Sequence, residues 1–245
     1  MWPSIARATL FALAFVTSAA VNDVLADDLA DFNAAVETAS AHNRVAIGYL
    51  RTGNLDLALL EIDRLREAWG AFERRFAGKR PVAFDGNPHY ATLWTGVNAR
   101  FVGIDLMISM GKPDAVRKSL EDIRGDLYDF RKAAGIVVLA DCVRDANVGM
   151  DALMVYDDRS HNLAMPQTRA DLAATAQRYG ATLTRCDGIA GDAVRKSAEF
   201  RRLIDGATAS LALIPQAIET REGDLLHRVL IELRSFDNLL AFRFG

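Results

Sequence analysis

Proline and strand-like patterns are scarce in this sequence. Only six prolines occur, and among them Pro81, Pro88, Pro113 and Pro166 fall in or next to expected connections. No segment alternates apolar and polar residues as a half-buried strand does, and 136–140 is the only β-branched run. These absences exclude a sheet-based fold and predict an all-α protein.

Motifs that mark enzymes and cofactor proteins are also missing. The sequence has no Cys-x-x-Cys-His for covalent haem and no Glu-x-x-His pairs for a di-iron site. It has no EF-hand loop, His-Glu-x-x-His, glycine-rich phosphate loop or Gly-x-Ser-x-Gly elbow. Covalent haem of the usual kind is therefore excluded. Because a Ser/His/Asp set is assembled in space and not in sequence, a hydrolytic enzyme with an unrecognised site stays as a third hypothesis.

A surplus of positive charge is lacking as well. The chain has 29 Lys and Arg against 32 Asp and Glu, a formal net charge of −3, and the two signs are interspersed. A protein that binds nucleic acid needs a basic patch or stripe to neutralise phosphates. We therefore expect no nucleic-acid partner.

Residues 1–26 have the layout of a secretory signal peptide. Arg7 is the only charged residue before the run Ala8–Val21, which is apolar apart from small hydroxyl residues, and Ala26 suits a cleavage site. The run is shorter than the ~20 residues that a transmembrane helix needs. We expect cleavage before Asp27, a periplasmic or secreted protein, and no stable membrane insertion after cleavage. An uncleaved anchor is the alternative.

Helical periodicity and helix breakers predict about eight helices in the rest of the chain. We expect them at residues 28–51, 54–77, 88–110, 113–133, 136–157, 168–187, 191–219 and 223–243. Very short connections at Gly53, Gly111 and Gly223 predict that the flanking helices pack as antiparallel hairpins.

Two breaks indicate how the hairpins are grouped. Residues 77–87 form the longest clear break in the first half, and Gly135 marks a second junction. We expect helical halves at 27–134 and 135–245, either as two four-helix bundles or as one eight-helix body. Segment 48–65 is similar to a tetratricopeptide hairpin in its glycine, tyrosine and alanine residues, but the hairpins here are longer than that repeat. The resemblance therefore implies helix–turn–helix packing and no family membership.

The chain has only two cysteines, and we expect them to pair. Cys142 lies early in one predicted helix and Cys186 late in the next, and the point midway between them falls in the connecting segment 158–167. Residues equidistant from the turn of an antiparallel hairpin face one another, and an exported protein favours disulfides. The spacing predicts a disulfide that links the two helices of the hairpin at the end far from its loop.

Methionine and histidine gather around that connecting segment. Met150, Met154, His161 and Met165 lie within 16 residues, and thioether plus imidazole suits copper in an oxidising compartment. Met150 or Met154 could instead ligate a non-covalent haem b together with His227. Methionines at helical spacing usually fill gaps in a hydrophobic core. The residues around His161 are of the types that long turns between helices use. We therefore predict no cofactor, with copper and haem b as alternatives.

Several arginines lie at apolar positions of the predicted helices. Arg66, Arg124 and Arg234 are the examples that we single out, and similarly placed aspartates such as Asp63 and Asp105 are available as partners. Inward-facing arginine usually forms an ion pair between helices, whereas the alternative is a pocket for a small anionic ligand. The aromatic-rich tail 236–244 is expected to pack into the protein, because free termini fray unless they are docked.

These patterns favour an exported, non-enzymatic accessory or binding module. We expect it to present helical grooves to a periplasmic protein partner or to a small anionic ligand. A periplasmic copper or non-covalent haem carrier that uses the Met/His cluster is the second hypothesis, and an enzyme is the third. No protein family is identified by these residues.

Overall fold

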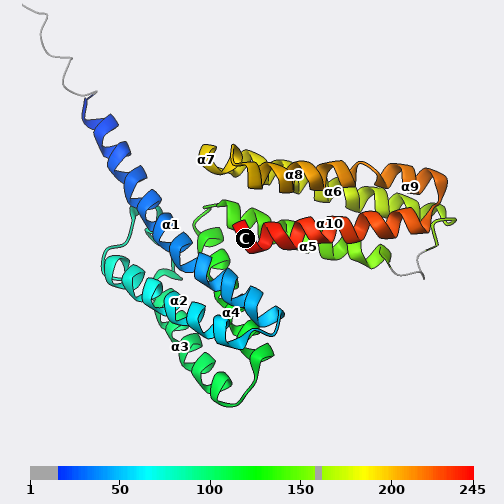
Figure 1. Ribbon diagram of the computed structural model, residues 1–245. Coiled ribbons are helices and arrows are strands. Elements are labelled where there is room, and N and C mark those ends of the chain that lie inside the picture. Colours follow the sequence, from blue (N-terminus) through cyan, green and yellow to red (C-terminus); the bar gives the residue numbers. More distant parts are fainter. Residues whose placement is uncertain (1–15, 158–161) are drawn as a thin grey trace, which may run out of the picture. The chain divides into compact units, whose positions relative to one another are not determined.

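The computed structural model describes residues 16–157 and 162–245, with side chains from residue 28 onward (Figure 1). Regular structure in these ranges is helical and contains no strand, which confirms the all-α prediction. Among the described helices, none combines the length and the apolar character needed to cross a membrane. The chain divides into two compact units at the junction of Ala134 and Gly135.

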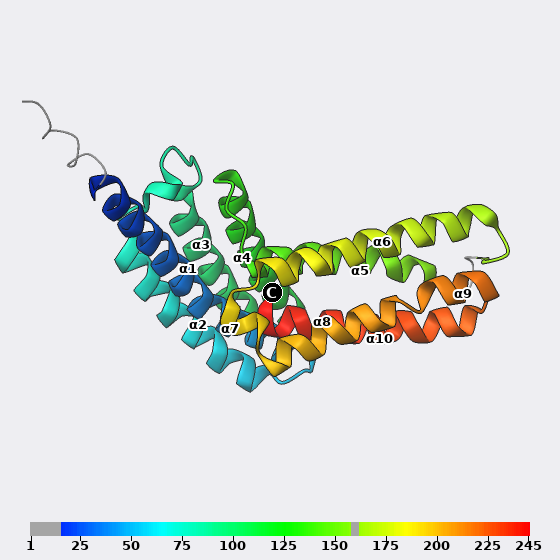
Figure 2. The same cartoon turned by 90° about the horizontal axis from the view of Figure 1, so that it is seen from above.

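The first unit consists of two helical hairpins. α1 (Val16–Arg51) pairs with α2 (Leu55–Phe76), and α3 (Tyr90–Ser109) pairs with α4 (Pro113–Ala133). A turn of 3-10 helix, η1 (Val82–Phe84), lies in the connection between the hairpins, and α1 also packs on α4 (Figure 2). α1 begins inside the predicted signal peptide and continues as one helix past the predicted cleavage position.

Both short turns use glycine in the left-handed region. Gly53 has a φ of 75° and Gly111 a φ of 64°, a conformation that costs other residues steric strain. The side chain of Asn54 then accepts a hydrogen bond from the Leu57 backbone N–H at 3.3 Å and caps α2. Pro113 opens α4, where its missing N–H has no helical partner to lose.

Aromatic rings fill the core of the first unit. Phe32 of α1 lies among rings from three other elements, with centroid distances of 4.8 Å to Phe72, 4.7 Å to Phe84 and 5.9 Å to Phe130. Its ring meets Phe72 edge-on, the arrangement that the charge distribution of aromatic rings favours. Because these residues come from α1, α2, η1 and α4, the cluster joins the two hairpins.

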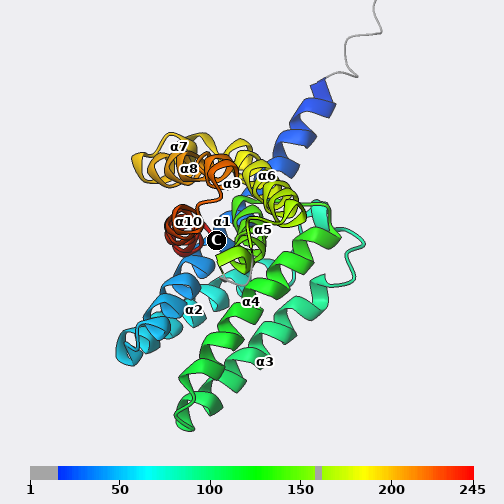
Figure 3. The same cartoon turned by 90° about the vertical axis from the view of Figure 1, so that its right-hand side faces the viewer.

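The second unit is also built from helical hairpins. Its elements are α5 (Leu139–Met154), η2 (Val155–Asp157), α6 (Pro166–Ile189), α7 (Asp192–Arg195), α8 (Ala198–Leu211), α9 (Ile214–Thr220) and α10 (Gly223–Phe244). α5 packs on α6 and α10, and α8 packs on α10, around a largely aliphatic core (Figure 3). The face where α6 meets α8 and α9 is packed less extensively than these.

The prediction of one helix over 191–219 is wrong, because this segment forms α7, α8 and α9. The Ser197 hydroxyl accepts a hydrogen bond from the Phe200 backbone N–H at 3.3 Å and starts a new helix. Pro215 has no N–H to offer the carbonyl of Leu211, and its ring would crowd that carbonyl, so α8 ends at Leu211.

The predicted start of one helix in this unit also needs correction. The helix expected from residue 136 begins at Leu139, since Val138 is extended with ψ 169° and its N–H donates to the Asp141 side chain at 3.4 Å. At the other end of the unit, Arg221 takes a positive φ of 57°, and α10 begins at Gly223, as predicted.

The cysteines and the C-terminal tail lie where the sequence places them. The Sγ atoms of Cys142 and Cys186 are 2.18 Å apart and the Cα atoms 5.4 Å apart, so the hairpin brings the pair to disulfide distance. Phe244 packs edge-on against Phe200 with ring centroids 5.1 Å apart, and Gly245 is buried. The tail therefore docks on the second unit.

Candidate functional site

An open groove runs between α6 and the pair α8–α9 in the second unit. It consists of two hollows of about 520 Å³ and 480 Å³, which share Thr208 and Ala212. Along α6 its lining extends from Ala173 to Asp187, and on the opposite side it crosses the break between α8 and α9 at Pro215. The groove therefore depends on the helix break that the sequence analysis missed.

Small side chains keep the groove open. α6 contributes Ala173, Gly180 and Thr184, and the facing helix contributes Ala209 and Ala212. None of these side chains is long enough to bridge the space between the helices. A Cβ atom at Gly180 would lie 2.9 Å from Leu211 Cδ2, so the missing side chain lets α8 approach α6. The result is a mainly apolar trough with isoleucines from α8 and α9 in its wall.

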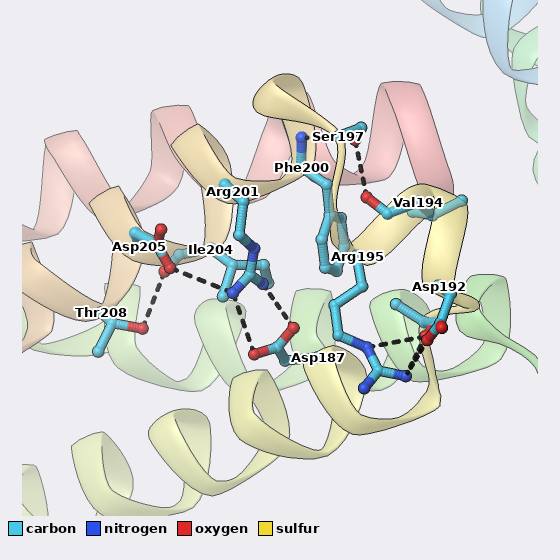
Figure 4. Close-up of polar contacts among 11 residues, drawn as sticks. Asp187, Asp192, Val194, Arg195, Ser197, Phe200, Arg201, Ile204, Asp205 and Thr208 are labelled. Atoms are coloured by element: carbon cyan, nitrogen blue, oxygen red, sulfur yellow. Dashed lines mark hydrogen bonds and ion pairs between the residues drawn. The ribbon is translucent and has the colours of Figure 1, made fainter.

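A charged cluster closes one end of the groove (Figure 4). The Arg201 guanidinium of α8 donates to both carboxylate oxygens of Asp187 on α6, at 2.5 Å and 3.3 Å. It also lies 3.5 Å from the carboxylate of Asp205, one turn further along α8. Arg201 is therefore balanced by two carboxylates, and the pair with Asp187 ties α6 to α8.

The short connection through α7 is held by hydrogen bonds to the backbone (Figure 4). The Arg195 guanidinium donates to the Ala190 carbonyl at 2.8 Å and 3.2 Å. The Ser197 hydroxyl donates to the Val194 carbonyl at 2.7 Å while it caps α8. These contacts fix where α8 starts and so fix this end of the groove.

The charged side chains that line the groove are all acidic. Asp187 and Asp205 lie at the closed end, and Glu219 lies at the α9 end, whereas no lysine or arginine is part of the lining. Glu219 is exposed. Even with Arg201 counted against Asp187 and Asp205, the groove has an apolar floor and a rim of net negative charge.

The Met/His cluster predicted from the sequence is spread over different environments. Met150 is fully buried in the core, Met154 is half-buried against the same core, and Met165 is exposed just before α6. His161 lies outside the described residues. His227, the second residue of the haem alternative, has its Nδ1 atom 2.6 Å from the Asp157 carboxylate.

Two of the three arginines singled out in the sequence, Arg66 and Arg234, form ion pairs between helices. Arg66 of α2 pairs with Asp105 of α3, and Arg234 of α10 lies 2.6 Å from Asp151 of α5. Arg124 is half-buried and is not free either. The guanidinium groups of Arg66 and Arg234 are therefore engaged within the protein.

Sequence reasoning missed a buried polar cluster in the second unit. Asp237 is 1% exposed, and burial raises its pKa to about 6, although a hydrogen bond from Asn147 and the charge of Arg234 oppose the shift. The pKa of the fully buried Tyr179 is also raised, first by burial and then by the charge of Asp237. The sequence did contain a signal for this cluster. Asp237 lies on the face of α10 whose other buried residues, such as Leu233 and Leu240, are apolar.

Neither a metal cluster nor a known relative defines this site. In the described ranges, no group of three or more His, Cys, Asp and Glu side chains is placed to hold a metal ion. Comparison with known proteins shows that the chain matches no family model, no curated protein and no solved structure.

Proposed function

We propose that the protein is an exported, non-enzymatic helical binding module whose α6/α8–α9 groove receives a helix from a protein partner. The observation that supports this proposal is the groove itself, a mainly apolar trough lined by small side chains and rimmed by carboxylates. Grooves of this kind bind the apolar face of an amphipathic helix, with anchors three and four residues apart.

The length of the groove fits a helix better than a compact small molecule. Its α6 wall runs from Ala173 to Asp187, which at ~1.5 Å per residue is about 21 Å. A partner helix of about 14 residues spans the same length. The small residues on both walls allow the backbone of such a helix to approach closely.

The charges select the chemistry of the partner. Because Asp187, Asp205 and Glu219 are the charged lining residues, a helix with lysine or arginine beside its apolar face is complementary. Charge complementarity raises the association rate and excludes partners of the same sign. The groove thus favours a basic amphipathic helix over the small anionic ligand suggested by the sequence.

A designed peptide tests the proposal. We would use a fluorescein-labelled amphipathic helix of about 16 residues, made of leucine, alanine and lysine, and measure its affinity by anisotropy. Ala173 and Ala174 are adjacent exposed residues of α6, but only Ala173 lines the groove. We expect Ala173→Trp to weaken binding by about tenfold or more, and we expect Ala174→Trp to bind like the wild type.

Two further peptides make the test decisive. One has the same composition in a scrambled order without an apolar face, and the other has glutamate in place of lysine. Both should bind at least about tenfold more weakly than the basic amphipathic peptide. Equal binding of the scrambled or acidic peptide, or equal binding by the two tryptophan variants, would contradict the proposal.

A further inference from the structure

The α6/α8–α9 groove consists of two hollows that differ in their chemistry. The hollow of about 520 Å³, which we call the apolar hollow, is walled mainly by apolar side chains, among them the buried Ala176 and Ile214 and the half-buried Leu211. The hollow of about 480 Å³, which we call the acidic hollow, lies toward the closed end and carries the carboxylates of Asp187 and Asp205. A helix that fills the whole groove therefore meets an apolar and a polar subsite in turn.

Asp205 is the more available carboxylate of the acidic hollow (Figure 4). Arg201 donates to both oxygens of Asp187, at 2.5 Å and 3.3 Å, whereas it meets the exposed Asp205 in a single ion pair of 3.5 Å. Because two carboxylates share one guanidinium, a negative charge stays uncompensated and attracts a further cation. The Thr208 hydroxyl lines both hollows, donates to the Ile204 carbonyl at 2.8 Å and can still accept a hydrogen bond. The acidic hollow therefore suits the ammonium group of a lysine from the partner.

The positions of the two hollows set the spacing of the groups that fill them. On α6 the apolar hollow is lined within residues 173–180 and the acidic hollow within residues 184–187, so their centres lie about nine residues or 14 Å apart. On the facing side the two linings span 208–219 and 204–212, and their centres lie about five to six residues or 8 Å apart.

A spacing of seven residues in the partner helix matches this separation. Seven residues of helix cover about 10.5 Å and are close to two full turns, so both groups lie on the same face. Spacings of four and eleven residues also return to that face, but they cover about 6 Å and about 16.5 Å, outside the range that the two walls give.

We infer that the partner helix carries a large apolar residue and a lysine seven residues apart, the first in the apolar hollow and the second against Asp205. This inference rests on the proposed function and specifies the sequence pattern that the groove recognises. The apolar residue supplies the buried contact, and the lysine fixes the register of the helix along the groove.

A set of unlabelled peptides of about 16 residues tests the spacing. Each consists of alanine and glutamine, with phenylalanine as the one large apolar residue and lysine as the one charged residue. The lysine is placed four, seven or eleven residues from the phenylalanine, on its N-terminal or its C-terminal side. Affinity is measured by displacement of the labelled leucine–alanine–lysine peptide. We expect the tightest peptide to have a spacing of seven and to bind about threefold more tightly than those with four or eleven, which is the scale of one exposed ion pair.

Matched variants locate the lysine. Asp205→Asn should weaken binding of the peptide with a spacing of seven about threefold and leave the binding of the same peptide with glutamine in place of lysine unchanged. Glu219→Gln, at the other end of the groove, should leave the preference for a spacing of seven intact. Circular dichroism of both variants should match the wild type, so that a loss of affinity reports on the groove and not on folding.

The failure of this inference is distinguishable from the failure of the proposed function. If the labelled peptide itself does not bind the groove, both fail. If it binds but the three spacings are equal, or if Asp205→Asn binds the lysine and glutamine peptides as the wild type does, only the spacing inference is wrong. Loss of the preference in Glu219→Gln would likewise overturn the assignment of the lysine to Asp205.

Discussion

Gly206 of α8 lies directly against the ring of Phe236 on α10. A Cβ atom at position 206 would be 2.5 Å from Cζ and 2.7 Å from Cε1 of that ring. Real Cβ atoms do not approach other atoms so closely, so a side chain at this position would force the Phe236 ring to shift. The mechanism is steric, because the glycine is helical and has no positive φ.

Gly206→Ala should therefore destabilise the protein, although alanine is the better helix former. Alanine gains about 1 kcal/mol in helix propensity, whereas overpacking a well-filled interface costs about 1–3 kcal/mol. We expect a net loss of about 1 kcal/mol in the free energy of unfolding in urea.

Gly188→Ala on α6 is the matched control, since a Cβ atom there would meet nothing within 4 Å. We expect it to stabilise the protein by up to about 1 kcal/mol. Combining Gly206→Ala with Phe236→Leu should recover part of the loss. Equal stability of the two alanine variants would show that the contact with Phe236 does not destabilise the Gly206→Ala variant.

Loss of the Cys142–Cys186 link should destabilise the second unit selectively. The cysteines are 44 residues apart in sequence, and closing a loop of that length restricts the unfolded chain by about 4 kcal/mol. From residue 27 onward the tryptophans are Trp69 and Trp94, both in the first unit. Tryptophan fluorescence thus follows the first unit, and far-ultraviolet circular dichroism follows both.

The double variant Cys142→Ala/Cys186→Ala should shift part of the circular dichroism transition to lower urea and leave the fluorescence transition in place. Wild-type protein treated with a reducing agent should behave like the variant. A shift of both transitions by the same amount would mean that the two units unfold together.

The buried carboxylate of Asp237 should make stability fall with rising pH. Its pKa is about 6, raised by burial above the ordinary 3.8, so the folded state holds the proton more tightly than the unfolded state. The contribution is fully present below about pH 4 and is lost as pH rises through about 6. The difference corresponds to about 3 kcal/mol.

Asp237→Asn removes the titrating group, so the free energy of unfolding of the wild type, relative to the variant, should decline between pH 4 and pH 7. Asp171→Asn, which changes an exposed carboxylate of α6, should leave the pH dependence of the wild type intact. If the Asp237→Asn and wild-type curves stay parallel over this range, the raised pKa is refuted.

Local signals account for what could be predicted about the fold. The turn at Gly53 and the cap at Asn54 each act within a few residues, so the sequence shows the first hairpin directly. The pairing of Cys142 with Cys186 follows from their equal distances to one loop. Pro215 is a local signal of the same kind, because proline ends a helix within one turn. The prediction of one helix over 191–219 did not use it.

The sites required information that no local pattern contains. The groove exists because Ala173 of α6 and Ala212 after α8 both lack a side chain long enough to fill the space between the helices. In the first unit, Arg100 of α3 is balanced because Asp122 and Asp126 of α4 both reach it. Arginines at apolar positions suggested an anionic ligand, whereas Arg66 and Arg234 are paired with carboxylates of neighbouring helices.

The amino-acid sequence by itself determined the all-α class, the hairpin turns and the cysteine pairing. Periodicity, caps and loop symmetry depend on interactions between residues close in sequence or equidistant from one turn. Tertiary structure alone decided which helix faces meet, which charges are neutralised and where space remains. Those properties depend on packing between residues far apart in the chain, which sequence spacing does not encode.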